Sequence, residues 1–542
     1  MKKIFFLFIT SGMLLFSACD NSLDETVYSD LLENGYQYTA DEVYNVIAPV
    51  YSNMRSFYTV TINYFMTQEC SADIAVLAAN SSGWDNAGLW RHLHQHTWNS
   101  EHDQIKAIWT PFYSGVIHAN RIINQLESGQ IPITDDLKKS IIAEMKVARA
   151  FYNWLIMDNF GDAILLMGVS QDIPGITSRS EIYNAVISDL KEAIPDLSED
   201  TSKKMYARFN KWAAKALLAN IYLNSEVYTG TAKWTECLAE CNDIINAGKY
   251  SLESDYFSNF KILNENSKEN IFTVPFDEWN SWSGGVAPQL AFLNFSLHSS
   301  SKATLNLESS PWGAGGFKAN PQFIDSYDPA DLRLKGSWFM GPQFAADGVT
   351  PVYCAYEKKG QQLIFTKELP DGIYTAENEG YRMKKYEIRN GNPLFMGNDV
   401  VFFRYGQVLM MKAECLLRSG QKDQAAQIVT QIRQRAFTDP AKATVTGAQL
   451  EGNTCYNYGY VENYKIVDKG DQSAVKYGRF LDELGWEFAL ENFRRRDLIR
   501  FGVFTTKSWL SHRPNGAYRT VFPIPQSALD SNPKLVQNPN YQ

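Results

Sequence analysis

Apolar residues recur at intervals of three and four through the first part of the chain, the spacing that places side chains on one face of an α-helix. The pattern predicts four helices there, over about 109–120, 141–155, 212–223 and 234–245. Thr134 begins the second helix, and Gly161 and Gly248 end the second and the fourth, because glycine readily adopts the left-handed conformation of a helix end. The residues at 250–252 are expected to form a short strand.

A second helical block follows much later in the chain. The same spacing predicts three helices in it, over about 405–416, 425–436 and 481–501. Gly420 and Gly502 end the first and the last. Helix pairs joined by short glycine-containing turns are typical of tetratricopeptide hairpins, although the strict consensus of that repeat is absent. We therefore expect a mainly α fold with a degenerate tetratricopeptide-like scaffold, built from helical blocks at about 41–250 and 404–502.

Between the two blocks, over about 260–400, the helical periodicity is lost. Glycine, proline, asparagine and serine are frequent there, which predicts a loop-rich inserted lobe with short strands. Long loops on a rigid scaffold commonly carry the binding residues of a protein. Trp282 and Trp312 of this lobe are therefore candidate ligand contacts. We expect residues 41–542 to form a single domain.

The chain begins with the pattern of an exported lipoprotein. Two lysines precede a mostly apolar run over 4–16, which is too short for a stable membrane span and fits a signal peptide. Small residues then lead to Cys19, the arrangement that a lipoprotein signal peptidase cleaves. We expect residues 1–18 to be removed, Cys19 to carry the lipid and residues 19–40 to form a flexible tether. An ordinary secretory signal with an incidental Cys19 is the alternative.

The composition narrows the classes of partner. The 542 residues carry a formal net charge of -9, which argues against nucleic acid and anionic membrane surfaces. The 7 cysteines are too few for a disulfide scaffold in so long a chain. Cys237 and Cys241 lie on one face of a predicted helix and are interpreted as small buried residues, because a disulfide across one helical turn is geometrically poor. No cofactor is predicted.

Aromatic residues are in excess, with 13 tryptophans, 29 tyrosines and 31 phenylalanines. Sugar rings stack on aromatic planes while their hydroxyls need polar partners, so an exported chain rich in aromatics suggests carbohydrate contact. Trp84 stands beside Asp85 and Asn86 in a segment with turn glycines, which makes it the best stacking candidate, with Asp85 and Asn86 as polar partners. Trp90 is a further candidate, followed by the two tryptophans of the lobe.

The same segment holds three alternating histidines, His92, His94 and His96. On a strand they would share one face, where they could hold a metal ion. A nearby acidic ligand pattern is missing from the sequence, and such sets are usually incidental. No metal site is therefore predicted.

Several motifs follow one another in order over nearly the whole chain. The strongest lies in the last predicted helix and comprises Glu483, Glu487, Ala489, Glu491, Arg494, Asp497-Leu498, Arg500 and Gly502. Others are Ala119-Asn120, Arg149-Ala150-Phe151-Tyr152, Phe160-Gly161-Asp162, Arg404-Tyr405 and Phe522-Pro523-Ile524-Pro525. In this order they resemble the SusD/RagB family of outer-membrane nutrient-binding lipoproteins. Leu484 and Asn492 depart from the family pattern, in which Arg and Gly are usual at these positions.

The resemblance implies a cell-surface lipoprotein that binds an oligosaccharide without catalysis and delivers it to a SusC-like TonB-dependent transporter. A peptide receptor of the RagB type and a surface glycoside hydrolase are the alternatives. A hydrolase needs two carboxylates facing each other across a cleft, about 5–10 Å apart, and no motif indicates such a pair. Glu487, Glu491 and Arg494 instead have the spacing of intrahelical ion pairs, and Glu414 is also interpreted as structural.

Overall fold

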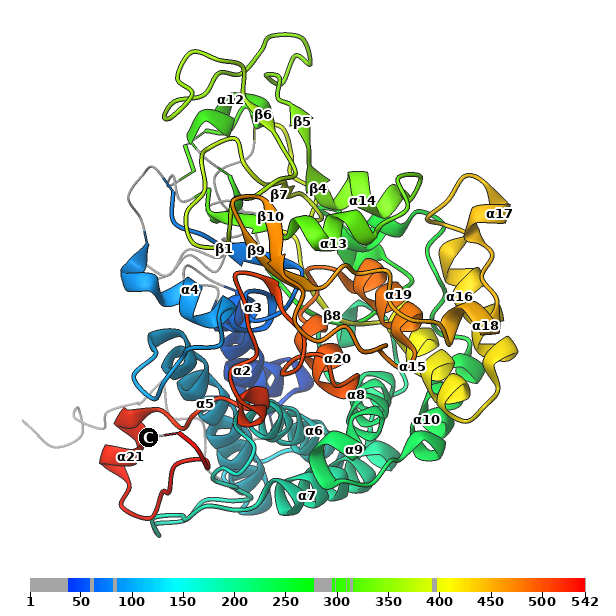
Figure 1. Cartoon of the computed structure of the whole chain (residues 1–542). Coiled ribbons are helices and arrows are strands. Elements are labelled where there is room, and N and C mark those ends of the chain that lie inside the picture. Colours follow the sequence, from blue (N-terminus) through cyan, green and yellow to red (C-terminus); the bar gives the residue numbers. More distant parts are fainter. Residues whose placement is uncertain are drawn as a thin grey trace, which may run out of the picture.

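We describe the protein from a computed structural model over residues 38–58, 63–80, 85–276, 295–297, 299–308, 310–311, 315–391 and 397–541. The predicted signal peptide, Cys19 and nearly all of the predicted tether lie outside these ranges. Helices dominate the described residues and the strands are short, as the sequence predicts (Figure 1). None of the described helices is long and apolar enough to cross a membrane.

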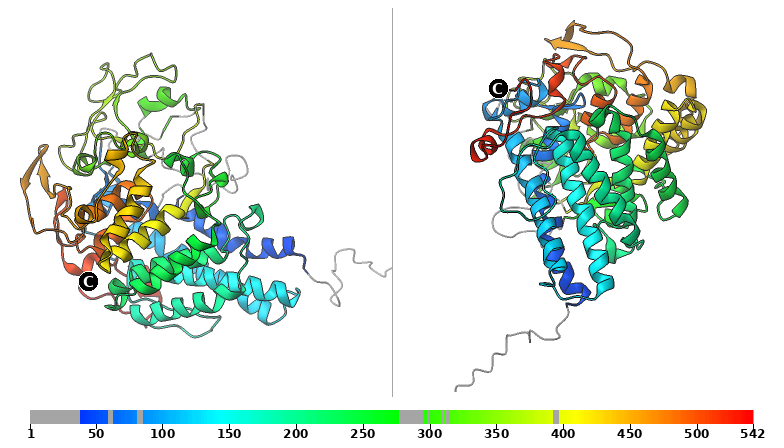
Figure 2. Two further views of the ribbon diagram at one scale, coloured as in Figure 1. Left: turned by 90° about the vertical axis from the view of Figure 1, so that its right-hand side faces the viewer. Right: turned by 90° about the horizontal axis from the view of Figure 1, so that it is seen from below.

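The first helical block is a row of helices, each packed against a neighbour. They are α2 (Ala40–Ser52), α5 (Asp103–Glu127), α6 (Asp135–Phe160), α7 (Arg179–Ala193), α8 (Lys211–Leu223), α9 (Ser225–Thr229) and α10 (Trp234–Ala247). α5 packs on α6, α6 on α7 and α8 on α10, and Figure 2 shows the long helices side by side. All four predicted helices are confirmed. Gly161 (φ 71°) and Gly248 (φ 62°) follow α6 and α10 as expected, whereas Thr134 makes no side-chain cap to α6.

The second block continues this row. α15 (Tyr405–Arg418) packs on α10 and on α16 (Lys422–Arg433), which confirms two further predicted helices. Cys237 and Cys241 of α10 are buried free thiols, as interpreted from the sequence. The strand predicted at 250–252 is wrong, because those residues lie in an irregular segment in which Ser251 N–H donates one backbone hydrogen bond to Lys268 O (3.1 Å).

The single last helix predicted over 481–501 is also wrong. The structure divides it into α19 (Gly478–Phe488) and α20 (Arg494–Arg500). Leu490 (φ 64°) and Asn492 (φ 66°) are left-handed, a conformation that cannot continue a right-handed helix. Asn492 N–H donates to Glu69 Oε1 (2.7 Å) at the end of α3 (Asn63–Glu69), so a distant contact holds the break. The Glu414 carboxylate pairs with Arg500 (2.7 Å), which confirms its structural role.

The lobe between the blocks is rich in loops and short strands, as predicted, and also holds a few short helices, but one strand of its main sheet comes from the first block. This antiparallel sheet has the order β1 (Ala75–Leu77), β3 (Phe317–Ala319), β7 (Arg382–Met383) and β4 (Trp338–Phe339). The other sheets pair β2 (Asn270–Val274) with β8 (Val400–Arg404), β5 (Gly341–Pro342) with β6 (Ile364–Phe365), and β9 (Gly459–Glu462) with β10 (Lys465–Asp468) and β11 (Trp509–Leu510). Short helices complete the fold: α4 (Leu89–His94), α12 (Lys302–Leu305), α13 (Pro321–Ser326), α14 (Leu332–Ser337), α17 (Pro440–Ala443), α18 (Gly447–Leu450) and α21 (Gln526–Ser531).

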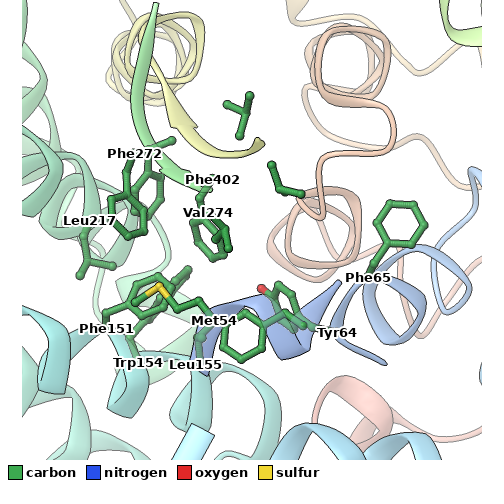
Figure 3. Close-up of a cluster of buried hydrophobic side chains, with 14 of the residues drawn as sticks. Met54, Tyr64, Phe65, Phe151, Trp154, Leu155, Leu217, Phe272, Val274 and Phe402 are labelled. Atoms are coloured by element: carbon green, nitrogen blue, oxygen red, sulfur yellow. The ribbon is translucent and has the colours of Figure 1, made fainter. Parts of the chain in front are cut away.

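A buried aromatic cluster joins the helices to the lobe (Figure 3). Phe151 and Trp154 of α6 pack against Phe402 of β8, with the ring centroids of Phe151 and Phe402 5.0 Å apart. Phe272 of β2 contacts the same rings. Since β2 and β8 border the lobe, the helical scaffold and the lobe share one hydrophobic core.

A second buried cluster is ionic. Arg404, the last residue of β8, contacts Glu269 (2.7 Å), Glu487 (2.8 Å) and Glu491 (2.7 Å), and all four side chains are almost fully buried. Burial disfavours the ionised form of Glu487, but Arg435 and Arg404 outweigh this effect and lower its pKa. The structural role predicted for these carboxylates is confirmed. The predicted intrahelical pairing is wrong, because their arginine partners come from distant parts of the chain.

Replacing Arg404 should test how far the fold depends on this cluster. We expect Arg404→Met to lower the free energy of unfolding by at least about 3 kcal/mol, since three buried carboxylates would lose a shared cation. Urea unfolding followed by circular dichroism measures the change. Lys442→Met is the control, because Lys442 forms an exposed pair with Asp328 (3.0 Å). Equal stability of the two variants would contradict the prediction.

Candidate functional site

One end of the β1–β3 pair brings together segments that are far apart in the sequence. Ala78 N–H, just after β1, donates to Gly316 O, just before β3 (3.1 Å). The chain that leaves β1 continues to Trp84, and the chain that enters β3 comes from Trp312. Trp84 and Trp312 themselves lie outside the described residues. Ala78 and Gly316, which stand before the first segment and after the second, lie at the same end of the sheet.

Trp90 connects a third segment to this region. Its ring on α4 lies 6.0 Å from that of Phe295, at an interplanar angle of 74°. Phe295 directly follows the segment that contains Trp282, which is also outside the described residues. Trp90 is 2% exposed. The prediction that Trp90 stacks on a ligand is therefore wrong, because α4 turns its ring into the core.

Asp85 and Asn86 lie at the surface on the chain between β1 and α4. The Asp85 side chain is partly exposed and forms a long ion pair with Arg91 (3.4 Å). Asn86 (φ 46°) and Ala87 (φ 54°) are left-handed and form a tight turn before α4. Both polar side chains are accessible to a ligand, and their binding role stays a prediction.

Tyr374 belongs to the same region and was not singled out from the sequence. Its backbone bridges Ala79, whose N–H donates to Ile373 O and whose O accepts from Thr375 N–H, both at 2.9 Å. The Tyr374 ring is 49% exposed, and its hydroxyl donates to Glu357 (3.2 Å). In the sequence an aromatic residue just after the Asp371-Gly372 turn was the available signal. We call the region formed by 78–80, Asp85, Asn86, Gly316 and Tyr374 the strand-edge site.

Two buried cations hold the loop that carries Tyr374. Lys318 Nζ of β3 donates to Thr375 Oγ1 (2.5 Å) and to Ala376 O (2.8 Å). Arg382 of β7 donates to Glu377 O and Glu379 O, each at 2.6 Å. Burial, and then the adjacent Arg382 cation, lower the pKa of Lys318 well below its ordinary value. These bonds to the backbone fix the loop before any ligand arrives.

The three histidines do not lie on a strand. His92 and His94 are on α4 and His96 follows it, so the face they were expected to share does not exist. Burial lowers the pKa of His94 to about 3, and His96 is equally buried, whereas His92 is partly exposed. Over the described residues no group of His, Cys, Asp or Glu has the arrangement of a metal site.

Comparison with known families identifies the chain. A family model described as "SusD family" matches residues 217–541, more than half of the sequence. A second model, described as "Starch-binding associating with outer membrane", matches residues 23–223. The chain belongs to the SusD family. The motifs that indicated this family from the sequence are thereby confirmed.

Individual relatives are distant but cover most of the chain. SusD-like protein P25 of Formosa agariphila is 26% identical over 457 residues, which are 80% of this chain and 78% of the relative. The starch-binding protein SusD of Bacteroides thetaiotaomicron is 23% identical over 82% of this chain and 80% of its own. The solved structure of a laminarin binding SusD-like protein has a TM-score of 0.69 at 21% identity, over 93% of this chain and 100% of that one. This likeness shows that the two share a fold.

Trp90 is buried and Tyr374 is half exposed, so replacing each residue should affect stability differently. We expect Trp90→Ala to lower the free energy of unfolding by about 3–5 kcal/mol, because it leaves a cavity in the core. Tyr374→Ala should leave the melting temperature nearly unchanged, because the Tyr374 ring is half exposed. Thermal and urea unfolding of both variants measure the difference. A large loss of stability in Tyr374→Ala would show that this ring is structural.

Proposed function

We propose that this SusD-family protein binds a glycan at the strand-edge site and catalyses no reaction on it. The observation that carries the proposal is that Ala78, which precedes the segment with Trp84, bonds to Gly316, which follows the segment with Trp312, next to the backbone bridge between Ala79 and the half-exposed Tyr374. Trp84, Trp282 and Trp312 are the proposed stacking residues, together with Tyr374. Asp85 and Asn86 are the proposed partners of the sugar hydroxyls.

The site offers what a sugar ring needs. An aromatic plane covers the apolar C–H face of the ring and contributes on the order of 1 kcal/mol. Asp85, next to Trp84 in the sequence, and Glu357, which accepts from the Tyr374 hydroxyl, carry carboxylates that can accept hydrogen bonds from the sugar hydroxyls. The cations Lys318 and Arg382 hold the Tyr374 loop in place, so less conformational entropy is lost on binding.

Two alternative functions fit the site less well. A glycoside hydrolase needs two carboxylates facing each other across a cleft, whereas Glu487 and Glu491 are buried against arginines. A peptide receptor remains the second candidate within the family. The descriptions of one relative as starch-binding and of one structural neighbour as laminarin-binding favour a glycan over a peptide.

Affinity electrophoresis in gels containing laminarin or starch tests the proposal. We expect at least one glycan to retard the protein, and Trp84→Ala to weaken that binding at least about tenfold, equivalent to roughly 1.4 kcal/mol. Tyr374→Ala should also weaken it. Tyr353→Ala is the matched control, since Tyr353 is an exposed tyrosine of the lobe outside the strand-edge site. Release of reducing sugar would support a hydrolase, and binding of peptides alone would support the receptor.

We further propose that Cys19 is lipidated and that the body lies on the outer face of the outer membrane, where it passes its ligand to a SusC-like TonB-dependent transporter. A lipid tether confines both proteins to the membrane plane and raises their effective concentration. The tether predicted at 19–40 would let the body act as a lid over the transporter.

Membrane fractionation and a pull-down test this second proposal together. Cys19→Ala should release the protein from membranes, because the lipid is its proposed anchor. A mild-detergent pull-down of the unaltered protein from native cells should recover a TonB-dependent barrel. Membrane retention of the variant, or recovery of this protein without a barrel, would argue against the tether or the partner, respectively.

A further inference from the structure

The β9–β10 hairpin covers a hollow that the strand-edge site does not include. The hairpin projects from the body of the molecule (Figure 2). The hollow measures about 460 Å³, within the usual range for small-ligand pockets. Its walls are Tyr464 at the hairpin tip, Asp325 of α13, and the strip from Lys367 to Leu369.

The floor of the hollow is apolar and reaches β1. Leu369, Val461 and Leu510 form a buried cluster with Val76, and Ile466 packs against it. Val76 is the middle residue of β1, the strand whose end forms the strand-edge site. The floor of the hollow therefore contacts β1, and the strand-edge site lies at the end of the same strand.

Tyr464 has a conformation that its side chain does not favour. Asn463 (φ 48°) and Tyr464 (φ 66°) are the two central residues of the hairpin turn, and both are left-handed. Turns of this kind favour Asn followed by Gly, so a bulky tyrosine at the second position is strained. The ring is nevertheless 53% exposed. Strain that is kept at an exposed aromatic residue points to a role in binding rather than in folding.

Two hydrogen bonds hold Tyr464 in place. Its hydroxyl donates to Glu379 Oε1 (2.5 Å) and its backbone N–H donates to Pro370 O (3.1 Å). The hydrogen bond from the Tyr464 hydroxyl to Glu379 is the main cause that raises the pKa of Tyr464 to about 12. The Tyr464 side chain, held by its hydroxyl, thus lines the hollow and is available as a stacking surface.

The rim of the hollow is polar but balanced in charge. Lys367 pairs with Asp325 (2.6 Å) and lies 3.7 Å from Glu368. Lys465 adds a second cation to the two carboxylates. An aromatic wall, an apolar floor and a neutral hydrogen-bonding rim suit an uncharged sugar ring better than an anionic ligand.

A short strip of chain connects the hollow to the strand-edge site. Leu369 lines the hollow and Tyr374 stands in the site, five residues further along. Five residues span at most about 18 Å. One extended glycan chain can therefore reach from the hollow to the strand-edge site.

We propose that the hollow under the β9–β10 hairpin is a second glycan-binding subsite, with Tyr464 as its stacking surface, which holds a distal part of an uncharged chain bound at the strand-edge site. This inference rests on the proposed function. It implies that affinity increases with the length of the glycan beyond what the strand-edge site alone provides.

Binding of laminarin fragments of increasing length, up to laminarihexaose and the intact polymer, tests the subsite by calorimetry. Tyr464→Gly should bind the longest ligands about fivefold to tenfold more weakly than the wild type, the effect of losing one stacking contact. Its affinity for the shortest fragment that the wild type binds should not change. Its melting temperature should not fall, because glycine relieves the strain of the turn. Tyr464→Phe should keep most of the length dependence, since it retains the ring.

Val467→Ala is the matched control, because Val467 is exposed on the same hairpin but does not line the hollow. Equal affinity of wild type and Tyr464→Gly for long chains would overturn the subsite and leave the strand-edge site intact. A fall in the melting temperature of Tyr464→Gly with unchanged affinity would make Tyr464 structural and also overturn it. Absence of glycan binding by the wild type would instead overturn the proposed function itself. That result differs from the two outcomes for Tyr464→Gly, in which the wild type still binds a glycan.

Discussion

The contact of Arg404 with three carboxylates is the constraint on which the rest of the structure depends. Glu269 stands next to β2, Glu487 is in α19, and Glu491 lies in the break before α20. A buried charge without its partner costs several kcal/mol, so none of these segments can move away alone. Since β2 and β8 carry the aromatic core from the helices to the lobe, this ion cluster fixes the frame on which the lobe is built.

Within that frame, β1 and the residues just after it contact both proposed binding surfaces. It is three residues long, yet it pairs with β3, leads into the chain that bridges Tyr374 at Ala79, and places Val76 under the β9–β10 hairpin. The loops proposed to bind the ligand are thus positioned against a strand of the helical block. Such an arrangement keeps irregular segments in register without requiring regular structure of their own.

The sequence predicted what depends on local periodicity and missed what depends on distant contacts. The helices α5, α6, α8, α10, α15 and α16 follow from their apolar spacing, and the structural role of Glu414 was also inferred from the sequence. The break at Leu490 and Asn492 was missed because Glu69, more than four hundred residues earlier, holds it. Trp90 and Trp84 look alike in sequence, and only packing against Phe295 shows Trp90 to be core. Tyr374 enters the site through a bridge to Ala79 that no local pattern encodes.

The buried cations of the lobe explain how its loop can serve a ligand. Lys318 and Arg382 bind backbone carbonyls of the loop rather than its carboxylates. The carboxylates of Glu357 and Glu379 therefore remain at the surface, where they accept from the hydroxyls of Tyr374 and Tyr464. Had the cations paired with these glutamates, the loop would still be anchored but neither tyrosine ring would be oriented. Lys318 and Arg382 thus set the position of the loop, while Glu357 and Glu379 orient the exposed side chains of Tyr374 and Tyr464.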